Sequence, residues 1–222
     1  MTMIKNYWVF TSKAYKFVMW LVLPLVAIGT SLWGYFSNNE MLIVVPTIIC
    51  FLIFPIIDVI SDYWLLPGFY AKGNSSLEFL QTTTKFQKMI RDVVIVDIVR
   101  RVVLYAGTYV MLYVLLSNKD IESQAFIQIY YYQPVLNILV TQTAVFVARF
   151  FRSLQQVFAC SMLSTVPNTI YISVVKPLPQ AVEQPIVMAL AGVAVVMIVV
   201  TIWFTQKKVR DSYYDKRFEN RV

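Results

Sequence analysis

The residue types that most often perform chemistry in proteins are scarce in this sequence. The chain of 222 residues contains no histidine, which excludes imidazole-based acid–base catalysis, H-E-x-x-H zinc sites and imidazole proton relays. Its six glycines form no G-x-x-x-x-G-K-[ST] loop, so no phosphate cradle of that type is encoded. Cys50 and Cys160 lie in apolar segments and are interpreted as packing residues. We therefore expect that the chain is not an enzyme and carries no cofactor or metal of its own.

The remaining candidate pair of catalytic carboxylates is Asp58 and Asp62, which are four residues apart at the end of an apolar segment. This spacing places both side chains on one face of a helix, where they either meet Arg100 or Arg101 as helix-end charges or contribute to a metal site. The pairing with arginine is favoured. Asp97 and Arg101 have the same spacing and are expected to pair with each other. These five residues are named the junction charges below.

The elements that must position these charges are predicted to cross a membrane. Hydrophobic residues make up 59% of the chain, charged residues 14% against about 25% in soluble domains, and the mean hydropathy is +0.65. A helix needs about 20 apolar residues to cross the hydrocarbon core. The sequence offers six apolar segments, the third of which reaches this length with the preceding residues 93–99, VVIVDIV. They predict an all-α, six-span membrane protein forming a single domain over residues 1–222. The segments are 14–36, 41–60, 102–116, 127–148, 157–175 and 186–204.

The distribution of basic residues predicts how these spans are oriented. With the N-terminus inside, seventeen of the nineteen Lys and Arg residues lie in inside segments, and only Lys119 and Lys176 lie outside. Because Lys and Arg are retained on the cytoplasmic side, both termini are predicted to be cytoplasmic. Residues 1–13 then form an interfacial or juxtamembrane segment, 61–101 a cytoplasmic region and 205–222 a cytoplasmic tail. Since the basic residues flank spans, no nucleic-acid partner is expected.

Polar residues inside the fourth and fifth predicted spans are costly in lipid and need a partner. Their spacing by three or four residues aligns them along helix faces. Two interpretations stay open, namely hydrogen bonds between packed helices and a wet translocation path. Pro167 is expected to bend the fifth span in either case. The candidate path residues are Asn137, Thr141, Gln142, Ser161, Thr165 and Asn168.

The segment 73–101, with the sequence GNSSLEFLQTTTKFQKMIRDVVIVDIVRR, holds eight formal charges between the second and third predicted spans. Ser75 and Glu78 have capping-box spacing, which predicts the start of a short helix parallel to the membrane. The threonines at 82–84 end it because they are β-branched and bond locally. A second, nearly continuous helix is predicted from Lys85 to Leu116, through the third span.

This layout resembles the membrane subunits of ABC exporters of the ABC-2 permease family. It is most similar to the compact bacterial permeases of that family. The resemblance rests on the six-span layout and on the loop motif "LEFLQTTT" followed by a basic helix and "DIVRR". It implies that a short coupling helix docks on a separate ATP-binding cassette subunit, which binds ATP and Mg. The implied coupling residues are Ser75, Glu78, Phe79, Leu80, Thr83 and Phe86. The chain departs from many members in its short loop between the fifth and sixth spans, KPLPQAVEQP.

The resemblance further implies a permease in the bacterial cytoplasmic membrane, working with a second permease copy as a homodimer or heterodimer. Its substrate would be amphipathic or hydrophobic, such as a peptide, a lipid-like compound or a drug, and it would contact membrane lipid. The alternative hypothesis is a non-transporting polytopic scaffold, assembly or immunity protein, in which the polar span residues serve only to pack helices.

Overall fold

The computed structural model describes residues 3–37, 52–65, 84–117, 124–149, 154–170, 173–174 and 179–219. Every element within these ranges is helical and no strand occurs among them, so the predicted all-α class is confirmed. The helices are α1 (Met3–Phe10), α2 (Lys13–Phe17), the π-helix η1 (Val18–Val22), α3 (Leu23–Phe36), α5 (Phe54–Leu65), α8 (Thr84–Ser117), α9 (Gln124–Ala148), α10 (Leu154–Leu163), α11 (Thr165–Ile170) and α12 (Gln180–Glu219).

The first predicted span forms one uninterrupted helix from α2 through η1 to α3. Its start is capped by Ser12, whose Oγ accepts a hydrogen bond from the backbone N–H of Tyr15 at 3.1 Å. Pro24 has no N–H, and its ring crowds the carbonyl of Trp20, which lies in η1. The wider π turn directly before Pro24 accommodates this ring without breaking the helix.

The other predicted spans differ from the observed helices mainly at their ends. The helix predicted from residue 85 to 116 is confirmed as α8, whose 34 residues extend about 51 Å at 1.5 Å per residue. The helix α9 begins three residues before the predicted fourth span, and α12 extends well beyond the sixth at both ends. Of the second predicted span, only residues 52–60 are described, and α5 continues past them to Leu65.

The fifth predicted span is interrupted, as Pro167 led us to expect. Ser164 separates α10 from α11 and lies three residues before Pro167, whose ring crowds the carbonyl of Leu163. The backbone N–H of Ser164 is shared between the carbonyls of Cys160 and Ser161, and its Oγ donates to the carbonyl of Ser161 at 2.5 Å. These bonds satisfy the polar groups at the break.

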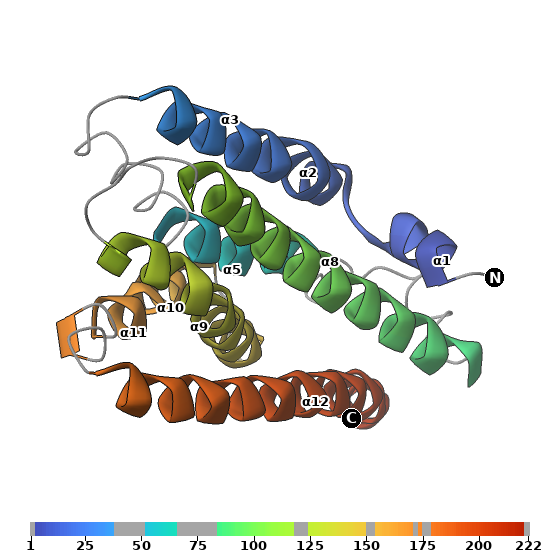
Figure 1. Cartoon of the computed structure of the whole chain (residues 1–222). Coiled ribbons are helices and arrows are strands. Elements are labelled where there is room, and N and C mark those ends of the chain that lie inside the picture. The colour runs from blue at the N-terminus through green and yellow to red at the C-terminus, as the bar shows by residue number, and fades with distance from the viewer. Residues whose placement is uncertain are drawn as a thin grey trace.

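The helix α8 lies at the centre of the packing and contacts α1, α3, α9 and α12 (Figure 1). The main hydrophobic core lies between α8, α5 and the α2–η1–α3 helix and includes Met19, Phe54 and Tyr109. A second cluster joins α5, α9 and α10. Cys160 is buried in it, as expected of a packing residue, whereas Cys50 lies outside the described residues.

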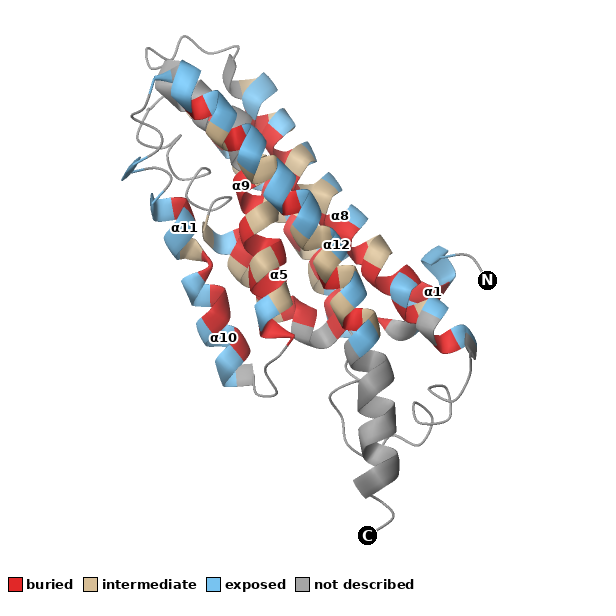
Figure 2. Ribbon diagram, turned by 90° about the horizontal axis from the view of Figure 1, so that it is seen from below, coloured by how far each residue is buried: buried red, intermediate tan, exposed pale blue. Residues whose placement is uncertain are grey.

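Two of the described helical segments, Lys13–Phe36 and Ala181–Lys207, are long and apolar enough to cross a membrane, and the shorter stretch Pro134–Ala148 is also apolar. Only 28% and 17% of their most apolar windows are buried. Exposed faces run along α12, as Figure 2 shows. They carry large apolar side chains such as Met188, Val196 and Trp203. A buried core helix of a soluble protein does not have this exposure.

Candidate functional site

Four buried charges from two helices form one cluster at the centre of the molecule. Asp58 on α5 accepts hydrogen bonds from Arg100 Nη2 at 2.7 Å and from Arg101 Nε at 2.6 Å. Asp97 on α8 accepts from Arg100 Nε at 3.1 Å and from Arg101 Nη2 at 2.9 Å. None of the four side chains is more than 4% exposed. Each arginine therefore bridges both carboxylates, and the formal charges of this central ion cluster cancel.

Neutral side chains from α8 itself and from two further helices, α2 and α9, complete the central ion cluster. Tyr15 donates its hydroxyl to Asp97, and Tyr105 donates its hydroxyl to Asp58 at 3.3 Å. The hydroxyls of Tyr105 and Thr141 are 3.2 Å apart, and Thr141 is the donor if Tyr105 donates to Asp58. Gln142 Oε1 accepts from Arg101 Nη1 at 2.9 Å. The cluster thus joins α2, α5, α8 and α9.

This ion cluster contributes less to the net free energy of unfolding than to the selection of one arrangement of the helices. Removing an ion from water costs several kcal/mol, and the attraction between partners repays this only when the remaining polar atoms are also bonded. Asp58 and Asp97 each accept three side-chain hydrogen bonds, so their cost is largely compensated. Deleting one partner of such a buried pair typically costs about 3–5 kcal/mol, which favours one helix arrangement over its alternatives.

A second buried ion pair joins three helices. Arg149, directly after α9, donates from Nε to Asp62 Oδ2 at 3.0 Å and from Nη2 to Asp62 Oδ1 at 2.8 Å. Its Nη1 donates to Thr205 Oγ1 on α12 at 2.8 Å. The hydroxyl of Thr205 in turn donates to the carbonyl of Thr201 at 2.7 Å, so every partner in this chain of bonds is fixed. The pair connects α5, α9 and α12.

The N-terminal helix α1 packs against the first part of α8. Asn6 Nδ2 donates to Asp92 Oδ2 at 2.9 Å, and both side chains are buried. Tyr7 is fully buried, and its hydroxyl accepts from Trp20 Nε1 at 3.1 Å. Burial, followed by the nearby negative charge of Asp97, raises the pKa of Tyr7 to about 12. The Tyr7 hydroxyl therefore remains protonated throughout the physiological range.

The structure brings all five junction charges into buried ion pairs. The predicted contacts of Asp58 with the arginines and of Asp97 with Arg101 are confirmed. Asp62, by contrast, pairs with Arg149 and not with Arg100 or Arg101. Among the described residues no group of three or more potential metal-ligating side chains occurs. Both members of the candidate carboxylate pair are instead neutralised by arginine.

The candidate path residues on α9 bond to side chains of α8. Asn137 Nδ2 donates to the Tyr109 hydroxyl at 2.5 Å, while Thr141 and Gln142 contact α8 as described above. All three are at most 1% exposed. On the other helices, Ser161 donates to the carbonyl of Phe158 at 2.6 Å. Within the single chain, these contacts favour the packing interpretation of the α9 residues.

The remaining predicted positions have mixed outcomes. Ser161 and Asn168 are buried, and the half-buried Thr165 donates to the carbonyl of Met162 at 2.8 Å. Phe86 is 2% exposed and belongs to the main hydrophobic core, so its side chain is not at the surface of the chain. The coupling residues that lie outside the described residues are Ser75, Glu78, Phe79, Leu80 and Thr83.

Sequence reasoning missed several members of these clusters. Tyr105 and Tyr109 continue the four-residue spacing of Asp97 and Arg101 along α8, a signal that was present in the sequence. Arg149 was interpreted only as a basic residue at the cytoplasmic end of a span. Tyr15, Asn6 and Asp92 had no local signal, because their partners come from distant segments.

Comparison with known proteins gave no matching family model, no matching curated protein and no matching solved structure.

Proposed function

We propose that this chain is a six-span membrane protein that acts as the permease subunit of an ATP-driven exporter. In this proposal both termini are cytoplasmic, a separate ATP-binding cassette subunit hydrolyses ATP, and a second permease copy completes the translocation pathway. The substrate is an amphipathic or hydrophobic peptide, lipid-like compound or drug. The observation that carries the proposal is the central ion cluster, which joins α8 to α5 where the predicted cytoplasmic region meets the third predicted span.

The exposed apolar faces support a membrane location. Large apolar side chains on α3, such as Leu25, Ile28 and Trp33, and on α12 face outward in the single chain. Exposed apolar surface of this kind is unfavourable in water and favourable in lipid. The buried carboxylates Asp58, Asp62 and Asp97 are each paired with arginine within the helix bundle, as a low-dielectric surrounding requires. The six-span topology extends this argument to the helices between Lys13–Phe36 and Ala181–Lys207.

The continuity of α8 supports a coupling role. Its 34 residues run without interruption from Thr84, directly after the predicted coupling helix, to Ser117. A displacement applied to the start of α8 is therefore transmitted along a stiff rod to the central ion cluster. Asp58 on α5 and Gln142 on α9 bond to the arginines of this cluster, so a displacement of α8 would also displace α5 and α9. This arrangement suits a membrane protein whose energy source lies on another chain.

A non-transporting scaffold is the second candidate, and one observation favours it. A scaffold requires the polar residues of the fourth and fifth spans to be buried between helices, and Asn137 and Ser161 are both fully buried. The two candidates differ in what they bind. An exporter subunit associates with an ATP-binding cassette protein through residues 61–101, whereas a scaffold binds another membrane protein and no such ATPase.

Affinity purification of the full-length chain from membranes of its own host in a mild detergent tests the exporter proposal. We expect an ATP-binding cassette subunit to co-purify, with vanadate-sensitive ATP hydrolysis in the same fraction. Glu78→Ala, in the predicted cytoplasmic region, is expected to abolish this association. Glu122→Ala, in a predicted outside loop, is the matched control and should retain it. Absence of any such ATPase, or equal effects of the two substitutions, contradicts the proposal.

A further inference from the structure

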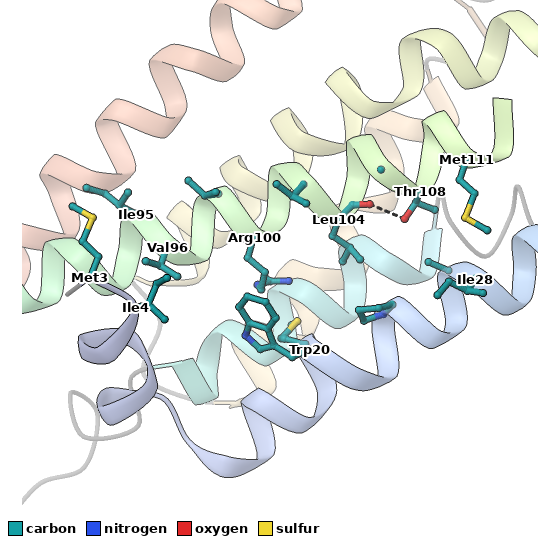
Figure 3. A pocket seen from close by; sticks show the side chains of 16 residues that line it. Met3, Ile4, Trp20, Ile28, Ile95, Val96, Arg100, Leu104, Thr108 and Met111 are labelled. Atoms are coloured by element: carbon teal, nitrogen blue, oxygen red, sulfur yellow. Dashed lines mark hydrogen bonds between the residues drawn. The ribbon is translucent and has the colours of Figure 1, made fainter. Parts of the chain in front are cut away.

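An apolar groove of about 720 Å³ lies between α1, the η1–α3 helix and α8 (Figure 3). Pockets for small ligands commonly have volumes of about 300–1,000 Å³. Its walls are formed by apolar side chains such as Ile4, Trp20, Leu104 and Met111. The hydroxyl of Thr108 donates to the carbonyl of Leu104 at 2.6 Å and is therefore not available as a donor. The groove accepts an apolar chain.

Arg100 supplies the single charged side chain among the residues that line this groove. Its Nε and Nη2 donate to Asp97 and Asp58, but Nη1 is buried and has no hydrogen-bond partner among the described residues. An unpaired buried donor is costly, and such groups usually have a partner in the functional state. A hydrogen-bond acceptor is therefore the chemical group that this end of the groove lacks.

We propose that the groove binds one anionic phospholipid of the cytoplasmic leaflet. A phosphate oxygen accepts a hydrogen bond from Arg100 Nη1, and one acyl chain lies along α8 toward Met111. Eleven residues separate Arg100 from Met111, which is about 16 Å of helix and close to half the hydrocarbon core of about 30 Å. A chain of one leaflet therefore fits this distance.

Charge complementarity favours an anionic lipid over a neutral one. The central ion cluster has no net formal charge, so its unpaired Nη1 offers a hydrogen bond without repelling an anion. The exposed Lys5 and Lys13, on α1 and α2 beside the groove, add positive potential at the proposed membrane surface. The inference depends on the proposed cytoplasmic orientation of α1 but not on the presence of an ATPase.

Two glycines provide a matched test of the groove. A Cβ atom at Gly107 or at Gly192 meets no other atom within 4 Å, so both positions have open space where a side chain would begin. Gly107 lines the groove on α8, whereas Gly192 lies on α12 and does not line it. Leucine at residue 107 thus obstructs the acyl chain while leaving the ion cluster untouched.

The experiment adds dioleoylphosphatidylglycerol to the purified full-length chain in detergent and counts bound lipids by native mass spectrometry. We expect one tightly bound lipid on the wild-type chain, at least a fivefold loss of binding with Gly107→Leu, and a change below twofold with Gly192→Leu. Equal binding to the wild-type chain and Gly107→Leu overturns the proposal. Conversion of a wild-type dimer into a monomer by Gly107→Leu, without loss of lipid, also overturns it by assigning the groove to a second copy of the chain.

A second arm tests the phosphate contact. Dioleoylglycerol has the same acyl chains and no phosphate, and it is expected to bind at least tenfold more weakly than the phospholipid. Arg100→Lys keeps a positive charge for the aspartates but lacks a guanidinium, so it is expected to remove this preference. Equal binding of the two lipids to the wild-type chain overturns the proposal. Because no ATPase is present, loss of lipid binding leaves the exporter proposal standing, and the converse also holds.

Discussion

Arg149 and Asp62, which are 87 residues apart in the sequence, form a two-pronged buried ion pair with N–O distances of 3.0 and 2.8 Å. The two parallel bonds fix both the distance and the relative orientation of the ends of α9 and α5. A third bond from Arg149 to Thr205 extends the constraint to α12. Together with the central ion cluster, this pair orders the bundle on the predicted cytoplasmic side.

Asp62→Asn is expected to destabilise the folded chain strongly, because it leaves the Arg149 guanidinium buried without its counter-charge. The expected loss is about 3–5 kcal/mol of unfolding free energy. The double substitution Asp62→Leu with Arg149→Met is expected to recover most of this loss, since it removes both charges together. Reversible unfolding in mixed detergent micelles, arranged as a double-mutant cycle, measures the coupling.

Lys207→Met is the control for this cycle, because Lys207 lies exposed on α12 over the ring of Trp203. Its effect on the unfolding free energy should stay below about 0.5 kcal/mol. A loss of that same size for Asp62→Asn shows that water reaches Arg149 and that the pair is not buried in the folded protein.

Arg101→Lys is expected to reduce stability by about 2–3 kcal/mol although it conserves the charge. The Arg101 guanidinium bonds simultaneously to Asp58, Asp97 and Gln142, and a single ammonium group does not reproduce that fork. Arg91→Lys, at an exposed position of the same helix, is the matched control and should be nearly neutral. Chemical unfolding of both variants checks the difference, and equal effects would show that charge alone matters at residue 101.

The all-α class and the long helix α8 could be predicted from the sequence because apolar runs are local signals. Asp97 and Arg101 were paired correctly for the same reason, as both lie on one helix face. The partner of Asp62 was predicted wrongly, because several arginines were equally plausible from spacing alone. Which of them reaches Asp62 depends on how α5 packs against α9, a relationship that no short segment encodes.

The polar residues of α9 illustrate the same limit. Their spacing correctly indicated a common helix face, and the partners of that face include the hydroxyls of Tyr105 and Tyr109 on α8. Tyrosines in an apolar run resemble ordinary packing residues, so their hydroxyls were not considered as partners. The sequence also could not predict that Nη1 of Arg100 lacks a partner. A guanidinium has five N–H donors, and only the folded structure determines which of them bond to the aspartates.

Tyr109→Phe is expected to cost about 1–2 kcal/mol, because it removes the hydroxyl that Asn137 Nδ2 contacts at 2.5 Å. If the contact serves packing, Asn137→Leu combined with Tyr109→Phe recovers stability, and transport measured in vesicles remains at the wild-type level. Val110→Ala, at an exposed position of α8 next to Tyr109, is the control. Selective loss of transport with normal stability in an Asn137 variant would instead favour a translocation path.

The raised pKa of Tyr7 predicts a loss of stability in alkali. The folded-state pKa of about 12 exceeds the ordinary value of 10.0, so the unfolded chain releases the proton first. Stability therefore falls as the pH rises from about 10 to about 12, and about 1.4 kcal/mol of this fall is expected by pH 11. Between pH 9 and pH 11, the unfolding free energy of Tyr7→Phe should fall by about 1.4 kcal/mol less than that of the wild-type chain. Identical pH profiles of the unfolding free energy contradict the prediction.

Membrane topology is tested most sharply at the two ends of α8. In the six-span arrangement, Lys88 lies in the cytoplasm and Lys119 outside. If only Lys13–Phe36 and Ala181–Lys207 cross the membrane, both lysines lie on the same, outer side. In a cysteine-free background, Lys119→Cys is therefore expected to react with a membrane-impermeant maleimide in intact cells, and Lys88→Cys only after permeabilisation.

The control for this labelling is Gly192→Cys, because residue 192 lies in the apolar part of α12 and is exposed on the single chain. In lipid its thiol stays protonated and inaccessible to the reagent, so no labelling is expected before or after permeabilisation. Labelling of Lys88→Cys in intact cells would place the start of α8 on the outer side of the membrane. It would thereby remove the cytoplasmic attachment on which coupling to an ATPase depends.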